Sequence, residues 1–273
     1  MPENLPCKIM GILNVTPDSF FDGGRYFNTK DAIERGVQMV DQGADIIDVG
    51  GESSRPFATK VETEVEIKRV IPVIKGLIKA GIHNISIDTT KPEVARKAVE
   101  AGAVIINDIS ASLSYVAADY KVGWVAMHMQ GTPLTMQLNP KYENIVSDIK
   151  RFLIQVAEEA TKIGVKEVWI DPGFGFGKTL NDNVELLNLI GEFTETNYQV
   201  MVGVSRKSFV GKISAPDVDL VSEALVETDK RKASSVALAM YVILQGVKMV
   251  RVHDVLETYQ AIKLLDELDR IKQ

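Results

Sequence analysis

The stretch Glu100-Ala-Gly-Ala-Val-Ile-Ile-Asn107 decides the fold. Gly102 joins the end of a helix-like segment to an apolar run, and that run ends at an amide side chain. Glycine just past a helix accommodates the left-handed backbone conformation, after which the chain can enter a strand. The same pattern recurs around four further glycines, which are Gly43, Gly81, Gly164 and Gly246. The sequence therefore predicts a repeated helix-to-strand unit.

Eight apolar runs along the chain predict eight strands. Most of the runs are continuous rather than alternating, as expected of parallel strands that are covered on both faces. The predicted strands are 8–15, 45–50, 84–89, 104–109, 123–129, 167–171, 199–205 and 248–254. The predicted helices are 31–42, 62–80, 92–101, 143–163, 183–194, 231–245 and 255–271.

Eight alternating units without a linker-like boundary predict an α/β fold with a single domain over residues 1–273, a TIM (β/α)8 barrel. A doubly wound open sheet is the alternative that the same alternation allows. The connections after the first, second and seventh strands are long, at residues 16–29, 51–61 and 206–221. Long loops on the catalytic face of a barrel commonly act as lids, and we interpret these three in that way.

Composition excludes several classes of protein. The net charge of −6 argues against a broad basic surface for nucleic acid. The longest apolar run, residues 236–244, is far shorter than the roughly 20 residues that span a bilayer. Cys7 is the single cysteine, so the chain has no internal disulfide and fits a reducing compartment. The first residues lack the features of a signal peptide, and we expect a cytoplasmic protein without nucleic-acid or membrane partners.

The carboxyl ends of the predicted strands carry polar side chains, whereas their first halves are almost entirely apolar. These polar residues are Asn14, Asp48, Asp88, Asn107, His128, Asp171, Ser205, Arg251 and His253. In a TIM barrel the active site lies at this end and draws residues from several strands. A purely structural barrel needs no polar residue at every strand end, so the pattern indicates an enzyme.

Two kinds of group stand out at these ends. Asp88, Asn107 and Asp171 could jointly accept hydrogen bonds from a flat, donor-rich heterocycle, each contributing about 1.5–3 kcal/mol. Bases near the strand ends suit a phosphate or pyrophosphate; they are Arg55, Arg206, Lys207, Arg251 and His253. The three histidines are scattered, and with one cysteine no zinc site emerges.

The segment Gly173-Phe-Gly-Phe-Gly-Lys-Thr179 is similar to a phosphate-binding loop. That motif has four residues between its outer glycines, whereas this segment has three. The preceding Asp171 would also repel a polyphosphate. We therefore favour Asp171 as the ligand-binding group, with the glycines framing it.

An ordered set of motifs covers nearly the whole chain. The motifs are Gly11-Ile-Leu-Asn-Val-Thr-Pro-Asp-Ser-Phe20, Asp48-Val-Gly-Gly-Glu-Ser-Ser-Arg-Pro56, Ile87-Asp-Thr89, Asn107-Asp-Ile109, Met127-His-Met-Gln-Gly131, Asp171-Pro-Gly-Phe-Gly-Phe-Gly-Lys178, Ser205-Arg-Lys-Ser208 and Arg251-Val-His-Asp254. Together they resemble the dihydropteroate synthase family of folate biosynthesis.

The resemblance implies a homodimeric TIM-barrel transferase that sulfonamides inhibit. It implies that 6-hydroxymethyl-7,8-dihydropterin pyrophosphate condenses with 4-aminobenzoate, with Mg²⁺, to give 7,8-dihydropteroate and pyrophosphate. By motif position, the catalytic residues would be Asp88, Lys207 and Arg251.

The resemblance also divides the site into parts. Pterin would contact Asp88, Asn107, Met127, Asp171, Phe176, Lys207 and Arg251. The 4-aminobenzoate site would comprise Phe20, Ser54, Arg55, Pro56, Ser205, Arg206 and Lys207. Pyrophosphate would contact Asn14, Arg55, Arg251 and His253, with Asn14 also a metal ligand.

Two rival functions share the barrel. A pterin-binding methyltransferase of the corrinoid-dependent kind would have no use for a pyrophosphate site, so Arg55 and the motif Ser205–Ser208 argue against it. A non-catalytic pterin-binding homologue is disfavoured because the motifs of the long loops are complete.

Overall fold

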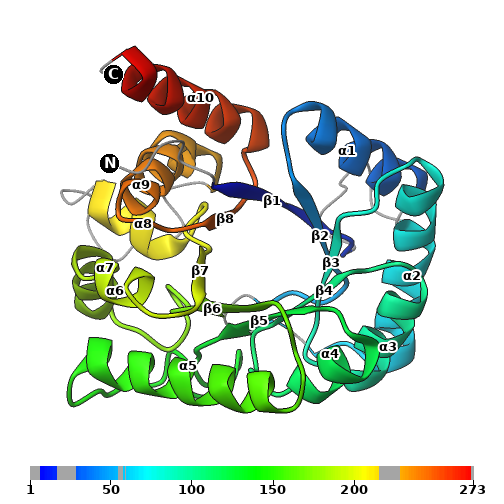
Figure 1. The fold of residues 1–273 in the computed structure, drawn as a ribbon, viewed down its shortest axis with the longest axis horizontal. Helices are drawn as coiled ribbons and strands as arrows, with labels where there is room; N and C mark the ends of the chain where they lie inside the picture. Colours follow the sequence, from blue (N-terminus) through cyan, green and yellow to red (C-terminus); the bar gives the residue numbers. More distant parts are fainter. Residues whose placement is uncertain (1–6, 17–28, 55–57, 59, 215–227, 272–273) are drawn as a thin grey trace.

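The computed structural model describes residues 7–16, 29–54, 58, 60–214 and 228–271 of the chain. Each strand pairs in parallel with the next, and β1 also pairs with β8, so the sheet closes into a barrel (Figure 1). The strands are β1 (Lys8–Asn14), β2 (Ile46–Gly50), β3 (Ile85–Asp88), β4 (Ile105–Asp108), β5 (Gly123–Met127), β6 (Val168–Asp171), β7 (Gln199–Val202) and β8 (Met249–Val252). The predicted TIM barrel is confirmed, and the open-sheet alternative is excluded.

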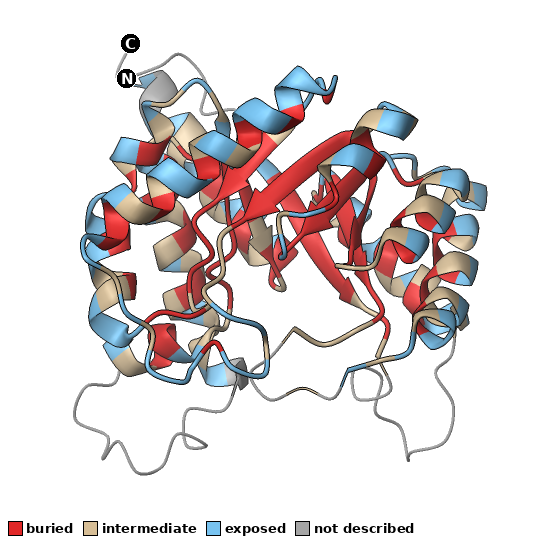
Figure 2. Ribbon diagram, turned by 90° about the horizontal axis from the view of Figure 1, so that it is seen from below, coloured by how far each residue is buried: buried red, intermediate tan, exposed pale blue. Residues whose placement is uncertain are grey.

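Helices surround the barrel and bury one side against it (Figures 1 and 2). They are α1 (Thr29–Asp41), α2 (Thr63–Lys79), α3 (Pro92–Glu100), α4 (Ser114–Tyr120), α5 (Ile145–Lys162), α6 (Leu180–Asn188), α7 (Gly191–Thr194), α8 (Ser208–Ser214), α9 (Lys232–Leu244) and α10 (Val255–Ile271). A 3₁₀ turn, Thr228–Arg231, precedes α9. None of the helices in the described part of the chain is long and apolar enough to cross a membrane.

The glycine between α3 and β4 adopts the conformation that the sequence predicts. Gly102 has a φ of 118°, and the next residue, Ala103, donates its N–H to the carbonyl of Ala98 at 3.0 Å. Positive φ therefore lets the chain leave the helix and turn directly into the strand. The other four junction glycines, Gly43, Gly81, Gly164 and Gly246, also have positive φ.

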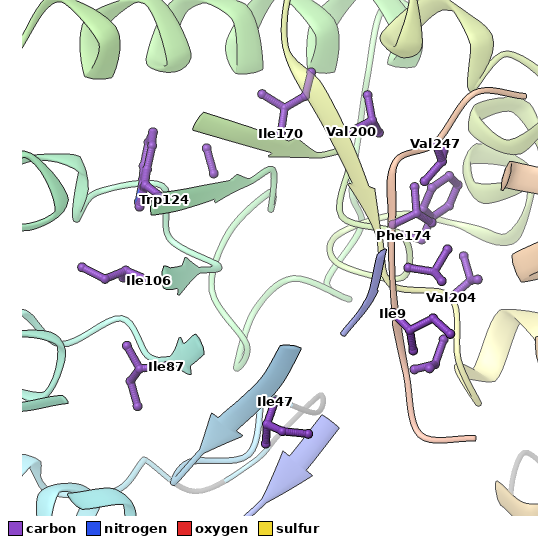
Figure 3. Close-up of a cluster of buried hydrophobic side chains, with 14 of the residues drawn as sticks. Ile9, Ile47, Ile87, Ile106, Trp124, Ile170, Phe174, Val200, Val204 and Val247 are labelled. Carbon is purple, nitrogen blue, oxygen red and sulfur yellow. The ribbon is translucent and has the colours of Figure 1, made fainter. Parts of the chain in front are cut away.

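Side chains that point outward from the strands form the larger core. Figure 3 shows Ile87, Ile106 and Trp124 directed from neighbouring strands toward the surrounding helices. These three side chains are fully buried. Apolar residues on both faces of each strand explain why the predicted strands are continuous apolar runs.

Side chains that point into the barrel change character along its axis. A separate apolar cluster fills the barrel interior toward the amino ends of the strands, with one residue from every strand except β3. Its members are Met10, Ile46, Ile105, Val125, Trp169, Met201 and Met249. Strand side chains alternate, so the residue two positions further along faces the same interior. On five of these strands that residue is Asp48, Asn107, Met127, Asp171 or Arg251. The interior is therefore filled by apolar side chains toward the amino ends of the strands and is mostly polar at their carboxyl ends.

The helix predictions differ from the structure in two ways. The short helices α4 and α8 were not predicted, because each has seven residues and little apolar periodicity. The predicted helix 183–194 is two helices, and the first begins earlier, at Leu180. Thr179 and Asp182 form a reciprocal capping box there, which starts α6 three residues before its apolar pattern becomes visible.

Candidate active site

Arg251 on β8 lies between two carboxylates at the carboxyl-end mouth of the barrel. Its Nε donates to Oδ2 of Asp48 at 2.6 Å, and its Nη2 donates to Oδ2 of Asp88 at 2.6 Å. Burial alone would lower the pKa of Arg251, but the two carboxylates raise it above its usual value. Arg251 is therefore a permanent cation that links β2, β3 and β8.

The pKa of Asp88 lies close to neutral pH despite that ion pair. Its side chain is buried, with 8% of the residue exposed. Burial raises the pKa of Asp88 to about 7, with Arg251 opposing the shift and Asp48 adding to it. A carboxyl group that can gain or lose a proton near neutral pH is typical of functional sites.

Asn107 on β4 is oriented by the same carboxylate that holds Arg251. Its Nδ2 donates to Oδ2 of Asp48 at 3.0 Å. Three buried atoms in this region have no hydrogen-bond partner among the described residues: Asp48 Oδ1, Ser86 Oγ and Asn107 Oδ1. Buried polar atoms are nearly always paired, so these atoms mark where donors of a ligand or of water would bind.

Asp171 at the end of β6 completes the acceptor set. Its Oδ1 accepts the N–H of Gly173 at 2.8 Å. Burial raises its pKa, while the positive charge of Lys207 lowers it. Only 3% of Asp171 is exposed, so a ligand that reached it would be nearly enclosed.

Lys207 follows β7 and lies against the loop that comes after β6. Its Nζ donates to the carbonyl of Phe174 and lies 4.5 Å from the centre of the Phe176 ring. Burial lowers the pKa of Lys207 to about 8, although Asp171 favours its charged form. Phe176, half-buried, therefore forms one wall of the mouth beside a lysine that can lose its proton.

The glycine loop does not form a phosphate cradle. The N–H groups of Gly173 and Gly175 donate to Asp171 and Asn183, at 2.8 and 2.7 Å. Lys178 is buried, and its Nζ contacts His128 Nδ1 at 3.1 Å and the Phe176 carbonyl at 2.9 Å. Because these groups are used within the protein, the choice of Asp171 over a phosphate-binding loop is supported.

Gly173 itself is required by close packing. It has a φ of 70°, and a Cβ added there would lie 1.9 Å from the carbonyl oxygen of His128. The loops after β5 and β6 thus touch through their backbones at this point. Lys178 adds a second link between the same two loops, because it also contacts His128.

Further bases lie beyond the ends of β7 and β8. The ring of His253 contacts Ser205, with Nδ1 and Oγ 3.0 Å apart. Arg206 makes a two-pronged ion pair with Asp254, at 2.9 Å from Nε and 2.5 Å from Nη2. The predicted bases after the seventh and eighth strands are therefore brought together.

Asn14, at the end of β1, is placed beside Asp88. Asn14 Oδ1 and Asp88 Oδ2 each lie 3.6 Å from the position that a Cβ on Gly50 would occupy. The small residue between them leaves room for two oxygens to face a common space. The described residues contain no group of three or more histidine, cysteine, aspartate or glutamate side chains that could hold a metal ion.

The remaining predicted residues have mixed outcomes. Met127 is buried at the end of β5, and Ser54 is half-buried in the loop after β2. Phe20, Arg55 and Pro56 lie outside the described residues, as do residues 17–28, 55–57, 59 and 215–227 of the long loops. The structure thus gathers Asn14, Asp88, Asn107, Met127, Asp171, Phe176, Lys207 and Arg251 at one end of the barrel.

Sequence reasoning missed three supporting residues. The sequence places Asp48 at a strand end but indicates no role for it, although it binds both Arg251 and Asn107. The sequence shows Lys178 only as part of a loop motif and does not indicate that Asp254 pairs with Arg206. The period-two spacing of Asp48 above Ile46 was the available signal, because it places the carboxylate inside the barrel.

Comparison with known proteins agrees with this site. Residues 10–253 match the family model described as pterin binding enzyme. The dihydropteroate synthase of Escherichia coli strain K12 is 42% identical over 265 residues, covering 94% of this chain and 90% of that protein.

Two solved structures of Xanthomonas albilineans dihydropteroate synthase are similar throughout. The one with 4-aminobenzoic acid has a TM-score of 0.87 and 39% identity, and covers 96% of this chain and 93% of that chain. The one in complex with 7,8-dihydropteroate has a TM-score of 0.83 and 36% identity, and covers 96% of this chain and 94% of that chain. The chain belongs to the dihydropteroate synthase family of pterin-binding enzymes.

Proposed function

We propose that this chain condenses 6-hydroxymethyl-7,8-dihydropterin pyrophosphate with 4-aminobenzoate to give 7,8-dihydropteroate and pyrophosphate. The observation that carries the proposal is the pairing of buried acceptors with half-buried cations at one mouth. Asp88, Asn107 and Asp171 supply the acceptors, and Arg251 and Lys207 supply the cations. Relatives whose structures contain 4-aminobenzoic acid and 7,8-dihydropteroate support the choice of substrates.

The pterin ring would lie among the acceptors. Its amino-pyrimidine edge carries N–H donors, which suit the oxygens of Asp171 and Asn107. Asn107 Oδ1 is buried without a partner among the described residues and is available for such a donor. The side chains that would pack around the ring and fix its plane are Met127, Phe176, Lys207 and Arg251.

Pyrophosphate would leave toward the bases. Arg251 at the end of β8 and His253 just after it would contact the pyrophosphate, and Arg55 would join them from the loop after β2. Cations that neutralise a leaving pyrophosphate lower the barrier to its departure, because charge develops on the leaving oxygen.

The residues near Asn14 fit a magnesium ion. Asn14 contributes an amide oxygen above Gly50, and Mg²⁺ prefers oxygen ligands from one or two protein groups and from substrate phosphates. Asn14 would hold the ion as it accompanies the pyrophosphate. When bound, the ion would supply further neutralisation of the leaving group.

The chemical step breaks one bond and forms another at the pterin methylene carbon. The C–O bond to pyrophosphate breaks with its electron pair moving to oxygen, the amine nitrogen forms the new C–N bond, and the nitrogen then loses its proton to the released pyrophosphate. Asp88, Lys207 and Arg251 would act here, with the Asp88 carboxylate stabilising positive charge on the pterin methylene. The arylamine is neutral at pH 7, so attack needs no histidine base.

The 4-aminobenzoate would bind outside the pterin. Ser205, Arg206 and Lys207 lie in succession after β7, and Ser54 lies in the loop after β2. Phe20, Arg55 and Pro56 would complete this site when the long loops close over it. Closure would exclude water that otherwise captures the pterin cation.

The proposal extends to the state of the protein. We place residues 1–273 in one domain with lid loops after β1, β2 and β7, and we infer a homodimer in the cytoplasm. The larger apolar core runs around the whole barrel and supports one domain, and the single cysteine, Cys7, fits a reducing compartment. The homodimer is inferred from the family resemblance alone.

A direct assay tests the proposed reaction. The protein is incubated with the dihydropterin pyrophosphate, 4-aminobenzoate and Mg²⁺, and pyrophosphate and dihydropteroate are measured together. We expect equal amounts of the two products, and we expect product formation to stop when the amine is omitted or Mg²⁺ is chelated. Pyrophosphate release that does not depend on the amine would contradict the synthase reaction.

A matched pair of variants localises the reaction to the mouth. Arg251→Gln removes the cation that faces Asp48 and Asp88, and should abolish dihydropteroate formation. Arg151→Gln removes an arginine whose side chain is 75% exposed on α5, and should leave the rate unchanged.

A further inference from the structure

Asp48 is a fully buried carboxylate at the mouth, and the proposed reaction gives it no task. Its exposed fraction is 0%, and it lies on β2 directly beside Ser86 of β3 in the sheet register. A buried carboxylate is costly unless it is paired and hydrogen-bonded. The residues that pair with Asp48 therefore indicate its role in the site.

One oxygen of Asp48 receives two hydrogen bonds. Oδ2 accepts from Arg251 Nε at 2.6 Å and from Asn107 Nδ2 at 3.0 Å. A carboxylate oxygen offers about two acceptor positions, so this atom is saturated. Asp48 thus contacts Arg251, one of the proposed cations, and Asn107, one of the proposed acceptors.

The contact with Asn107 fixes the direction of an amide. An asparagine presents a donor on one side and an acceptor on the other, and the neighbouring hydrogen bonds decide which faces where. If the Asn107 amide were turned over, its oxygen would face Oδ2 of Asp48, and two acceptors would lie 3.0 Å apart. Asp48 therefore holds Asn107 with its nitrogen toward Asp48, and Asn107 Oδ1 has no hydrogen-bond partner among the described residues.

The contact with Arg251 has a similar consequence for the guanidinium. With Nε bound to Asp48, the group is turned so that Nη2 reaches Asp88 at 2.6 Å. An arginine held at one end presents its remaining donors in a fixed plane. The same oxygen thus sets the direction of both side chains.

We propose that Asp48 is a positioning residue that orients Asn107 as a hydrogen-bond acceptor for the pterin and aligns Arg251 with Asp88. This inference rests on the proposed function. Asp48 acts through its neighbours by Oδ2, and its loss should weaken pterin binding even though Asn107 and Arg251 remain. A ligand that offers N–H donors is favoured, because the oriented amide offers only oxygen.

Two substitutions at Asp48 separate orientation from charge. Asp48→Ala removes the acceptor, and should weaken binding of the dihydropterin pyrophosphate about tenfold or more, as expected when a hydrogen bond to a charged group is lost. Asp48→Asn preserves the shape and can keep an amide oxygen in the place of Oδ2, so it should recover most of that loss. It also provides a folded variant if Asp48→Ala is unstable.

A double-mutant cycle tests whether Asp48 acts through Asn107. The dissociation constant of the dihydropterin pyrophosphate is measured by calorimetry for the parent, Asp48→Ala, Asn107→Ala and the double variant. Coupled residues give non-additive effects. We expect Asp48→Ala to weaken binding at least about threefold less in the Asn107→Ala background than in the parent, with the remaining effect carried by Arg251.

A control just before the same strand tests whether loss of any aspartate near β2 would weaken binding through lower stability alone. Asp45 precedes β2 at the opposite end of the barrel, where its Oδ2 accepts the N–H of Ile9 at 2.7 Å. Asp45→Ala should lower the unfolding temperature without changing pterin affinity.

Three outcomes would overturn the positioning role. They are equal effects of Asp48→Ala in both backgrounds, an Asp48→Asn variant as weak as Asp48→Ala, and an Asp45→Ala variant that loses pterin affinity to the same degree. Failure of the proposed function would look different, because the parent chain itself would then form no dihydropteroate.

Discussion

Arg251 reaches across 163 positions of sequence to place its Nη2 2.6 Å from Oδ2 of Asp88. The contact joins β8 to β3 across the barrel mouth, since the two strands are not neighbours in the sheet. Burial raises the pKa of Asp88 while Arg251 opposes that shift, and the resulting pKa of Asp88 is about 7. A ligand that contacts either member will change this balance.

Asp171→Asn should weaken pterin binding by about 1.5–3 kcal/mol, because the acceptor loses its charge while its shape is kept. Calorimetry with the dihydropterin pyrophosphate measures this directly. Asp182→Asn is the control, since Asp182 caps α6 and should affect stability alone. Unaltered pterin affinity in Asp171→Asn would remove Asp171 from the site.

Affinity for the dihydropterin pyrophosphate should fall as the pH rises through about 8. Burial lowers the pKa of Lys207 to about 8, so the ammonium is present below that pH and lost above it. A neutral amine attracts the anionic substrate less.

The Lys207 prediction is checked by measuring dissociation constants from pH 6.5 to 9.5. Lys207→Gln should bind more weakly at pH 6.5 and lose the fall near pH 8. The control is Lys212→Gln on the neighbouring helix α8, which should keep the parent's profile. A Lys207→Gln variant with the parent's pH dependence would assign the titration to another group.

Lys91→Met should destabilise the fold by about 3–5 kcal/mol, the usual cost of leaving a buried charge unpaired. Lys91 bonds to Glu66, whose side chain is 0% exposed, and to Glu52 at 2.7 Å. Urea unfolding measures the change in the free energy of unfolding.

The double variant Lys91→Met with Glu66→Met is the informative control for this pair. It removes both buried charges and should recover a large part of the loss. No recovery would mean that Lys91 stabilises the fold chiefly through Glu52, which also accepts the N–H of Val61 at 2.7 Å.

Gly173→Ala should destabilise the protein by more than about 2 kcal/mol and weaken pterin binding. Its Cβ would lie 1.9 Å from the His128 carbonyl oxygen, so the loop after β6 must shift and carry Asp171's N–H donor with it. Gly81→Ala is the matched control, because Gly81 also has positive φ, at 88°, but a Cβ there meets nothing within 4 Å. It should cost only about 1 kcal/mol of backbone strain. Equal losses in both variants would show that strain rather than contact dominates.

The sequence contained the fold in its helix-glycine-strand repeats. Gly102 and its counterparts have the positive φ that the pattern requires, and the strands end within a few residues of their predicted ends. Polar residues at the strand ends located the mouth, because period-two geometry and the TIM-barrel rule are both local to each strand.

Side-chain pairing across the mouth could not be predicted in the same way. The partners Arg251 and Asp48 lie 203 positions apart, and nothing in either local sequence specifies the other. The identity of the residue that orients Asn107 depends on how eight strands tilt and stagger, which appears only when the barrel is closed. The roles of Phe20, Arg55 and Pro56 stay predictions, since those residues lie outside the described part of the chain.

The pairing of β1 with β8 has a consequence for the timing of folding. Arg251, on the last strand to be synthesised, is the cation that neutralises Asp48 and Asp88 on strands made much earlier. In the closed barrel, β8 brings Arg251 to both carboxylates and also pairs with β1. The strand that closes the barrel therefore also supplies the cation at its mouth, so the charges there are balanced only once the last strand is in place.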